Sequence, residues 1–278
     1  MTPLRIASFS SNGTGGNPAG VVISDSLPDP AEMQSIAASL GFSETAFAAP
    51  EGNAWRVRYY APVSEVAFCG HATIALGAAL GAQRGAGRFD LNLRDAKITV
   101  EAMQQNDTWH ATLQSPGTWS KPLTDDLAHQ IISLFSLTPA DLDPTLPPTM
   151  AFAGVRHVIL ALKDRTKLAL MSYPFELMRD LMADHDLVTV SLLYIHGPRH
   201  FEARNAFASG GVVEDPATGA AAAALGGALV DMDWDGLRDG GSFMISQGTD
   251  MGVPSALKVD VTGTPGASVR VSGAVRWM

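Results

Sequence analysis

Two stretches of the chain repeat one pattern of residues, 149 positions apart. Residues 65–80 read EVAFCGHATIALGAAL and residues 214–229 read EDPATGAAAAALGGAL, so half of the aligned positions are identical. Both stretches are rich in Ala, Gly and Leu, which predicts a helix that can be buried on all sides. Chance similarity between two helices of biased composition is the alternative, but the shared Glu65 and Glu214 lie outside the biased part. We therefore expect an internal duplication with two similar α/β halves.

The segments around these helices predict the rest of the fold. Asp29-Pro30 and Gly41 bracket an amphipathic helix as its start and its stop. Hairpins are predicted for residues 42–59 and 89–102, and residues 115–118 (SPGT) are interpreted as a linker. Beyond the linker we expect helices at 124–134 and 174–182 and strands at 155–162, 188–195 and 201–207. The predicted domains are residues 1–117 with about 265–278, and residues 118–264.

Composition limits the class of protein and its partners. With 278 residues, 46% of them hydrophobic and 17% charged, the chain is expected to fold into one large domain or two ordinary ones. Asp and Glu outnumber Lys and Arg by 28 to 19 without any basic run, so no nucleic-acid partner is expected. The longest small-and-apolar stretch, 218–230, is shorter than the ~20 residues that cross a bilayer, and the chain begins without the pattern of a secretory signal. We expect a cytoplasmic protein, which also suits its single cysteine, Cys69.

The starts of the two repeated helices are the candidate binding positions. Unpaired backbone N–H groups and the helix dipole favour negative charge there, and the aligned Gly70 and Gly219 let a ligand approach the backbone. If the two halves pair, a carboxylate or enolate would meet donors from both sides. The alternative is that these glycines only allow tight helix packing. Because the whole motif is duplicated, we favour the binding site and expect a small carboxylic acid as ligand.

Three reactive side chains lie near these starts. His71 is one residue into its helix, where the dipole favours a neutral imidazole that donates a hydrogen bond or shuttles a proton, but a structural histidine is equally compatible with this position. Asp215 precedes Pro216 and is either a helix cap or a site residue. Cys69 is either a reactive thiolate or an inert packed side chain. Its counterpart in the repeat is Thr218, so the chain has no pair of thiols.

Glu44 is the more informative carboxylate. In a strand, Phe42, Glu44 and Ala46 share one face, which then carries a carboxylate among apolar neighbours. A carboxylate that is partly removed from water takes up and returns protons nearer to neutral pH. The alternative is a surface strand in which Phe42 is the exception.

No metal and no nucleotide cofactor is expected. A single cysteine excludes a cysteine-based zinc cage, and the Gly-Pro between His196 and His200 prevents the helix that would bring both to one ion. Residues 13–16 (GTGG) lack the third glycine of a dinucleotide fingerprint and the Gly-Lys pair of a phosphate loop.

Five short segments occur in series along the chain: 16–22 (GNPAGVV), 43–47 (SETAF), 68–73 (FCGHAT), 211–219 (GVVEDPATG) and 247–255 (QGTDMGVPS). Together they resemble the PhzF-like family of phenazine biosynthesis, which is related in fold to diaminopimelate epimerase. Any one segment is weak evidence for this family, but five segments in this order are highly specific for it. The resemblance implies an α+β fold of two pseudo-symmetric halves. Each half would be a β-barrel-like sheet around a central helix, with the active site in the cleft between the halves.

The resemblance also implies roles for individual residues. Glu44 would be the acid/base that moves a proton between carbons, with His71 and Asp215 holding the substrate or assisting the transfer. The implied substrate-binding positions are Asn17, Ser43, Cys69, Gly70, Thr218, Gly219 and Ala220. Cys69 and Thr218 fall where the related epimerases carry their two thiols, so one of the two positions is retained. The absence of the second thiol favours a carboxylate-driven isomerisation.

Further departures concern the substrate. Ala220 stands where the phenazine enzyme has Ser, and Val253 replaces a common Arg. We expect a cofactor-independent isomerase of a small carboxylic acid that forms a homodimer and contacts no membrane. One alternative is a single-thiol amino-acid racemase or epimerase that uses Cys69. The other is a non-catalytic protein that binds a metabolite or serves as a scaffold.

Overall fold

The structure is a computed structural model that describes residues 2–94 and 96–278. The chain forms two compact units, which are described one at a time. Unit 1 comprises Met1–Gln114, Val253–Ala256 and Ser272–Met278, and unit 2 comprises Ser115–Gly252 and Leu257–Val271. The chain passes from one unit to the other between Gly252 and Val253 and within each of three strands, β8 (Thr108–Gly117), β16 (Ser255–Val261) and β17 (Ser268–Trp277).

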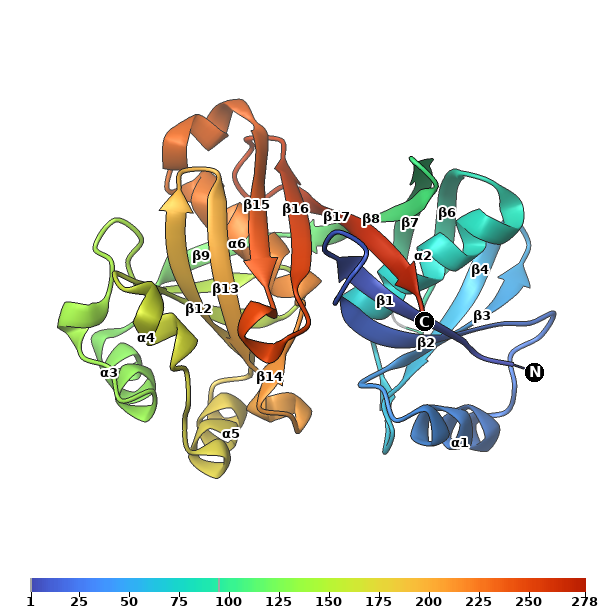
Figure 1. The fold of residues 1–278 in the computed structure, drawn as a ribbon, viewed down its shortest axis with the longest axis horizontal. Coiled ribbons are helices and arrows are strands. Elements are labelled where there is room, and N and C mark those ends of the chain that lie inside the picture. The colour runs from blue at the N-terminus through green and yellow to red at the C-terminus, as the bar shows by residue number, and fades with distance from the viewer. Residues whose placement is uncertain (1, 95) are drawn as a thin grey trace. The chain divides into compact units, whose positions relative to one another are not determined.

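Unit 1 wraps its strands around one helix, α2 (Gly70–Arg84), whose residues His71–Gly81 are all buried (Figure 1). The other elements of unit 1 are β1 (Leu4–Ser10), β2 (Asn17–Ile23), α1 (Pro30–Leu40), β3 (Thr45–Glu51), β4 (Ala54–Tyr60), β5 (Glu65–Val66), β6 (Gly87–Asn92) and β7 (Lys97–Gln105). Strands β1, β2, β3, β6 and β7 all contact α2. An all-round apolar helix of small residues is therefore the core of this unit, as the sequence predicts.

Helix α1 covers the other face of β2 and β3. It begins at Pro30 after Asp29, whose carboxylate accepts a hydrogen bond from the backbone of the first turn, and it ends at Gly41 in the left-handed conformation. Met33 and Ala37 of α1 pack against Phe47 in a small apolar cluster. Because one face of β3 meets α1, the alternate residues of this strand face α2.

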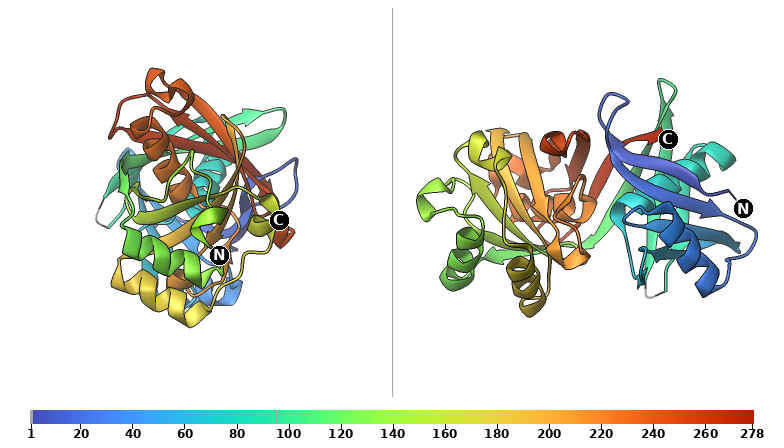
Figure 2. Two further views of the ribbon diagram at one scale, coloured as in Figure 1. Left: turned by 90° about the vertical axis from the view of Figure 1, so that its left-hand side faces the viewer. Right: turned by 60° about the horizontal axis from the view of Figure 1, so that its bottom comes forward.

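Unit 2 repeats the arrangement around α6 (Gly219–Asp231), which contacts β9, β10 and β11. The other strands and α-helices of unit 2 are β9 (Trp119–Pro122), α3 (Asp125–Leu134), β10 (Thr149–Phe152), β11 (Arg156–Leu162), α4 (Arg165–Ala169), α5 (Phe175–Asp184), β12 (Leu187–Gly197), β13 (His200–Ala206), β14 (Glu214–Asp215) and β15 (Gly241–Gln247). Four 3₁₀ turns occur at Pro139–Asp141, Ala208–Gly210, Trp234–Asp239 and Thr249–Met251. Helices α3 and α5 lie side by side (Figure 2), and their Ile131 and Met178 join a core with Val158 of β11.

Strand pairing follows the same scheme in both units. In unit 1, β2 is parallel to β3, β3 is antiparallel to β4, and β4 pairs with the short β5 through Tyr60 and Glu65. In unit 2, β11 is parallel to β12, β12 is antiparallel to β13, and β13 pairs with the short β14 through Ala206 and Glu214. The expected α+β fold of two similar halves, each with a sheet around a central helix, is therefore confirmed.

Both central helices approach their sheets closely at glycines. A Cβ atom at Gly81 would lie 2.5 Å from a ring carbon of Trp109, and one at Gly226 would lie 3.0 Å from methyl groups of Val259 and Val269. A larger residue at Gly81 would force the helix or Trp109 to move, and one at Gly226 would require Val259 and Val269 to give way. In the described part of the chain, no helix combines the length and the hydrophobicity that a membrane crossing requires.

The predicted linker at 115–118 begins where the chain passes from unit 1 to unit 2, between Gln114 and Ser115, but it is not an irregular segment. Ser115 and Gly117 continue β8, and β9 begins directly after Thr118. The Ser115 hydroxyl accepts a hydrogen bond from the backbone of Val269, and the Thr118 N–H donates to the carbonyl of Gly266 over 3.1 Å. These partners from a distant part of the chain keep the Pro-Gly segment extended, although its composition alone favours a turn.

Candidate active site

Glu44 lies just before β3, on the strand face that meets α2. Its backbone carbonyl accepts a hydrogen bond from Gly20 and so extends the parallel pairing of β2 and β3. Ala46, two residues further on, is fully buried, and the Glu44 side chain is 13% exposed. The alternation of the strand thus sets a carboxylate at the rim of an apolar face, as predicted from its sequence.

Ser43, Glu44, Cys69 and His71 gather at the start of α2. The Nε2 atom of His71 lies 3.5 Å from Oε2 of Glu44 and 3.3 Å from Oγ of Ser43. The other ring nitrogen, Nδ1, lies 3.3 Å from the Cys69 sulfur. The imidazole therefore stands between a carboxylate and a thiol, both of which can exchange protons.

Buried hydrogen bonds hold this helix start in place. The Ser8 hydroxyl donates to the carbonyl of His71 over 2.7 Å, and the Thr73 hydroxyl donates to the carbonyl of Cys69 over 2.7 Å. The Thr73 hydroxyl also pairs with that of Tyr59 at 2.6 Å. Burial raises the pKa of Tyr59 well above its ordinary value, so its hydroxyl stays protonated and can donate.

One atom of the cluster has no hydrogen bond. Oε2 of Glu44 is buried, and no hydrogen-bond donor reaches it within the described residues. Gly70 is the first residue of α2, one position before His71, and the first N–H groups of a helix have no partners within the helix itself. A buried acceptor and nearby backbone donors are the two features that an acid/base site for an anionic substrate requires.

The start of α6 carries a different polar group. Asp215 is buried and accepts a hydrogen bond from the hydroxyl of Thr218, the residue that precedes the first turn of α6. Gln247 donates to the carbonyl of Asp215 over 2.7 Å and accepts from the N–H of Thr218 over 3.2 Å. Gly219 and Ala220 are the first two residues of the helix. Asp215 thus bonds the side chain of the N-cap residue.

Gln247 was not among the predicted site residues. Gln247 lies on β15 and contacts both Asp215 and Thr218, which are about 30 residues earlier in the sequence. Its position at the beginning of the fifth family-like segment, 247–255, is the signal that could have identified it.

Asn17 has a less direct connection to these groups. It is buried at the start of β2 and faces Ser8 across the β1–β2 pair, and the Ser8 hydroxyl in turn reaches the carbonyl of His71. Of the predicted residues, unit 1 therefore brings Ser43, Glu44, Cys69 and His71 into contact beside Gly70. Unit 2 brings Asp215 and Thr218 together beside Gly219 and Ala220.

Each helix start is preceded by an ion pair. In unit 1, Arg58 of β4 binds Glu65 of β5 with two of its guanidinium nitrogens. In unit 2, Arg204 of β13 binds Glu214 of β14 in the same way, and these hydrogen bonds raise the pKa of Arg204. Glu65 and Glu214 are the shared acidic residues of the repeat. Their role in both units is to tie the short strand before the helix to the sheet.

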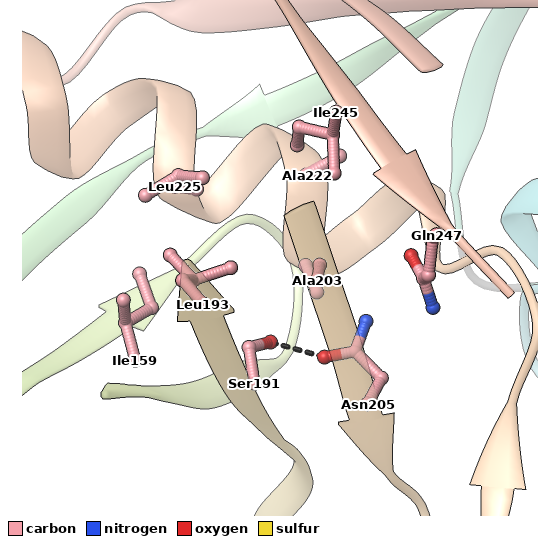
Figure 3. Close-up of a pocket in the computed structure, with 10 residues that line it drawn as sticks. Ile159, Ser191, Leu193, Ala203, Asn205, Ala222, Leu225, Ile245 and Gln247 are labelled. Atoms are coloured by element: carbon pink, nitrogen blue, oxygen red, sulfur yellow. Dashed lines mark hydrogen bonds between the residues drawn. The ribbon is translucent and has the colours of Figure 1, made fainter. Parts of the chain in front are cut away.

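Unit 2 also contains a small pocket beside α6 (Figure 3). Its lining combines apolar side chains with the polar Ser191, Asn205 and Gln247, and the Ser191 hydroxyl donates to the amide oxygen of Asn205. The strand register places Asn205 opposite Asp215, as it places Tyr59 opposite Val66 in unit 1. In unit 1 the side chain of Tyr59 occupies the equivalent space. In unit 2 the side chain at this position is the smaller Asn205, and a pocket remains.

Comparison with known proteins identifies the family. Residues 6–277 match the family described as phenazine biosynthesis-like protein. Trans-2,3-dihydro-3-hydroxyanthranilate isomerase of Pseudomonas fluorescens is 30% identical over 272 residues, which cover 96% of this chain and 92% of that protein. An uncharacterised isomerase of Deinococcus radiodurans is 30% identical over 278 residues, with 97% and 90% covered.

Solved structures show the same fold. The crystal structure of the Bacillus anthracis phenazine biosynthesis protein of the PhzF family matches with a TM-score of 0.86 at 22% identity, over 99% of this chain and 96% of that one. The match over nearly the full length agrees with the order of the five sequence segments. The chain therefore belongs to the phenazine biosynthesis-like protein family, and it is an isomerase.

Proposed function

We propose that this isomerase needs no cofactor and that Glu44 moves a proton between two carbons of a small carboxylic acid. The observation that carries the proposal is the environment of Glu44. Its Oε2 atom is buried, accepts no hydrogen bond from the described residues and lies 3.5 Å from the imidazole of His71. A carboxylate in this state is free to accept a proton from a substrate carbon.

The reaction is a proton shift. Glu44 takes a proton from a carbon that is α or vinylogous to an activating group, and the electron pair of the broken C–H bond passes into an enolate-type anion. The backbone N–H groups at the start of α2 stabilise this anion, and one donor of this kind is typically worth roughly 3 kcal/mol. Protonated Glu44, assisted by His71, then returns the proton to another carbon or face. Nothing is oxidised or reduced, so the step calls for no redox cofactor.

We also propose a role for the start of α6. The duplication and the family resemblance favour a role in substrate binding for this helix start as well, through Asp215 and Thr218. The relative from Pseudomonas fluorescens is named for an anthranilate derivative, which supports a carboxylic acid as the substrate class. Ala220 and Val253 depart from the phenazine motif, and we therefore propose a different acid for this chain.

Solvent deuterium exchange tests the assignment of Glu44. Candidate small acids are incubated with the protein in D₂O, and deuterium at carbon is measured by NMR. We expect Glu44→Gln to slow the exchange by about 10²- to 10⁴-fold, the usual contribution of a general base. Glu51→Gln is the matched control, because Glu51 is the last residue of β3, the strand that follows Glu44, but binds Arg56 at the surface. Equal exchange by the wild type and Glu44→Gln would show that the assignment is wrong.

Two other functions remain as alternatives. A racemase that uses Cys69 as its base is favoured by the 3.3 Å contact between the thiol and His71. Cys69→Ser would abolish that activity, but it should leave exchange driven by Glu44 largely intact. Binding of small acids without any exchange would instead support the non-catalytic protein.

A further inference from the structure

We propose that Glu44, Cys69 and His71 form an inhibitory site for a thiophilic divalent metal ion, with Zn²⁺ as the best match. One ligand atom from each of the three residues lies within 4.8 Å of the other two. The site itself is inferred from geometry and ligand chemistry. Its inhibitory effect rests on the function proposed above.

The distances suit a tetrahedral ion. Nε2 of His71 lies 3.5 Å from Oε2 of Glu44 and 4.0 Å from Sγ of Cys69. Zinc bonds of about 2.0 to 2.3 Å place neighbouring ligand atoms about 3.3 to 3.6 Å apart. Small rotations of these side chains would therefore bring all three atoms to one ion. Because Glu44 and Cys69 come from separate segments, spacing along the chain does not reveal the cluster.

Burial and chemistry favour a cation at this position. The side chains of His71 and Glu44 are 7% and 13% exposed, and Cys69 is buried. A buried carboxylate oxygen without a hydrogen bond, such as Oε2 of Glu44, is stabilised by an ion. Thiolate, imidazole and carboxylate together select zinc-like metals, whereas Mg²⁺ and Ca²⁺ prefer oxygen ligands alone. Three protein ligands leave a fourth position for water.

Binding would stop the proposed reaction. The metal would occupy Oε2 of Glu44 and Nε2 of His71, which are the atoms assigned to proton transfer. Inhibition is therefore expected to be reversible by a chelator.

Metal binding is measured directly on the full chain, without substrate. We expect calorimetry to find one Zn²⁺ per chain, and Co²⁺ to give a near-ultraviolet charge-transfer band from a bound thiolate. Cys69→Ser should abolish the band and weaken Zn²⁺ binding by at least about 10-fold, with a similar loss for Glu44→Gln. Retention of the band or of full Zn²⁺ affinity in Cys69→Ser would overturn the proposal.

His196→Gln is the matched control. The rings of His196 and His200 stack at 4.9 Å, and Glu202 lies 2.9 Å from His196, so this partly exposed cluster is the rival place for zinc. Loss of binding in this variant, with normal binding in Cys69→Ser, would place the ion there and contradict the inference. If zinc binds at Glu44 but no acid exchanges, only the proposed function fails. If exchange depends on Glu44 but zinc does not bind, only this inference fails.

Discussion

Arg204 and Glu214 form a nearly buried ion pair just before α6, with 12% and 6% of their side chains exposed. Their counterparts before α2, Arg58 and Glu65, form the same pair at 27% and 22% exposure. The duplication therefore provides two versions of one interaction that differ in burial. A charge left without its partner costs more where water cannot reach it.

Replacing each arginine by methionine tests this difference. We expect Arg204→Met to lower the free energy of unfolding by about 3 to 5 kcal/mol, because Glu214 becomes an unpaired buried charge. Arg58→Met should cost about 1 kcal/mol, since Glu65 is better solvated. Urea denaturation of both variants measures the two values. Equal losses would contradict the role of burial, and the double variant with Glu214→Gln should recover part of the larger loss.

The space that Tyr59 fills in unit 1 leads to a second prediction. Thr73→Ala should cost about 1 to 3 kcal/mol, because the buried Tyr59 hydroxyl loses its partner. Ala222 is the aligned residue of α6 and lines the pocket of unit 2. Ala222→Thr should therefore fit without loss, and thermal unfolding of both variants is the measurement. A large loss for Ala222→Thr would show that the pocket has no room for the side chain.

His157 makes the stability of the fold depend on pH. It is fully buried on β11, its Nδ1 atom bonds the Thr189 hydroxyl at 2.8 Å, and burial lowers the pKa of His157 from 6.5 to about 3. Between these values the unfolded chain binds a proton that the folded chain does not bind. The stability from this residue is complete above about pH 6.5 and falls with decreasing pH, by at most about 1.4 kcal/mol per unit.

Comparison with His157→Gln isolates this contribution. The free energy of unfolding is measured by denaturation from about pH 4.5 to about pH 7.5, which covers the upper part of the range between the two pKa values of about 3 and 6.5. Its slope against pH should be smaller for the variant than for the wild type. The slope and not the absolute stability is compared, because the substitution also removes a buried contact. Identical slopes would mean that His157 titrates normally in the folded protein.

Asp215 tests whether unit 2 takes part in the reaction assigned to Glu44. We expect Asp215→Asn to slow deuterium exchange by about 10- to 100-fold although the base is intact, because substrate positioning is disturbed. Asp231→Asn is the control, since Asp231 binds Ser120 at the opposite end of α6. Unchanged exchange in Asp215→Asn would limit the site to unit 1.

Local patterns predicted those parts of the fold that depend on neighbouring residues. The cap at Asp29, the stop at Gly41 and the strand alternation at Glu44 each follow from a few adjacent positions. The partners of Glu65 and Glu214 could not be predicted, because the register of two strands determines which arginine each one meets. The contacts of Gln247 with Asp215 and Thr218 also join distant segments, although its place in the fifth family-like segment could have identified it. Residues 115–118 show the converse case, because distant hydrogen bonds hold in an extended conformation a segment whose local composition indicates a linker.

The glycines inside the central helices have a consequence for catalysis. With Trp109 against Gly81, and Val259 and Val269 against Gly226, neither helix can recede from its sheet without opening a void. In the reaction proposed above, the amide dipoles at the first turn of α2 would therefore not need to reorient when charge develops on the substrate. Preorganisation of this kind lowers an activation barrier because the solvating groups already point in the required direction. The tight interior of each unit would thus support the proposed role of the start of its central helix.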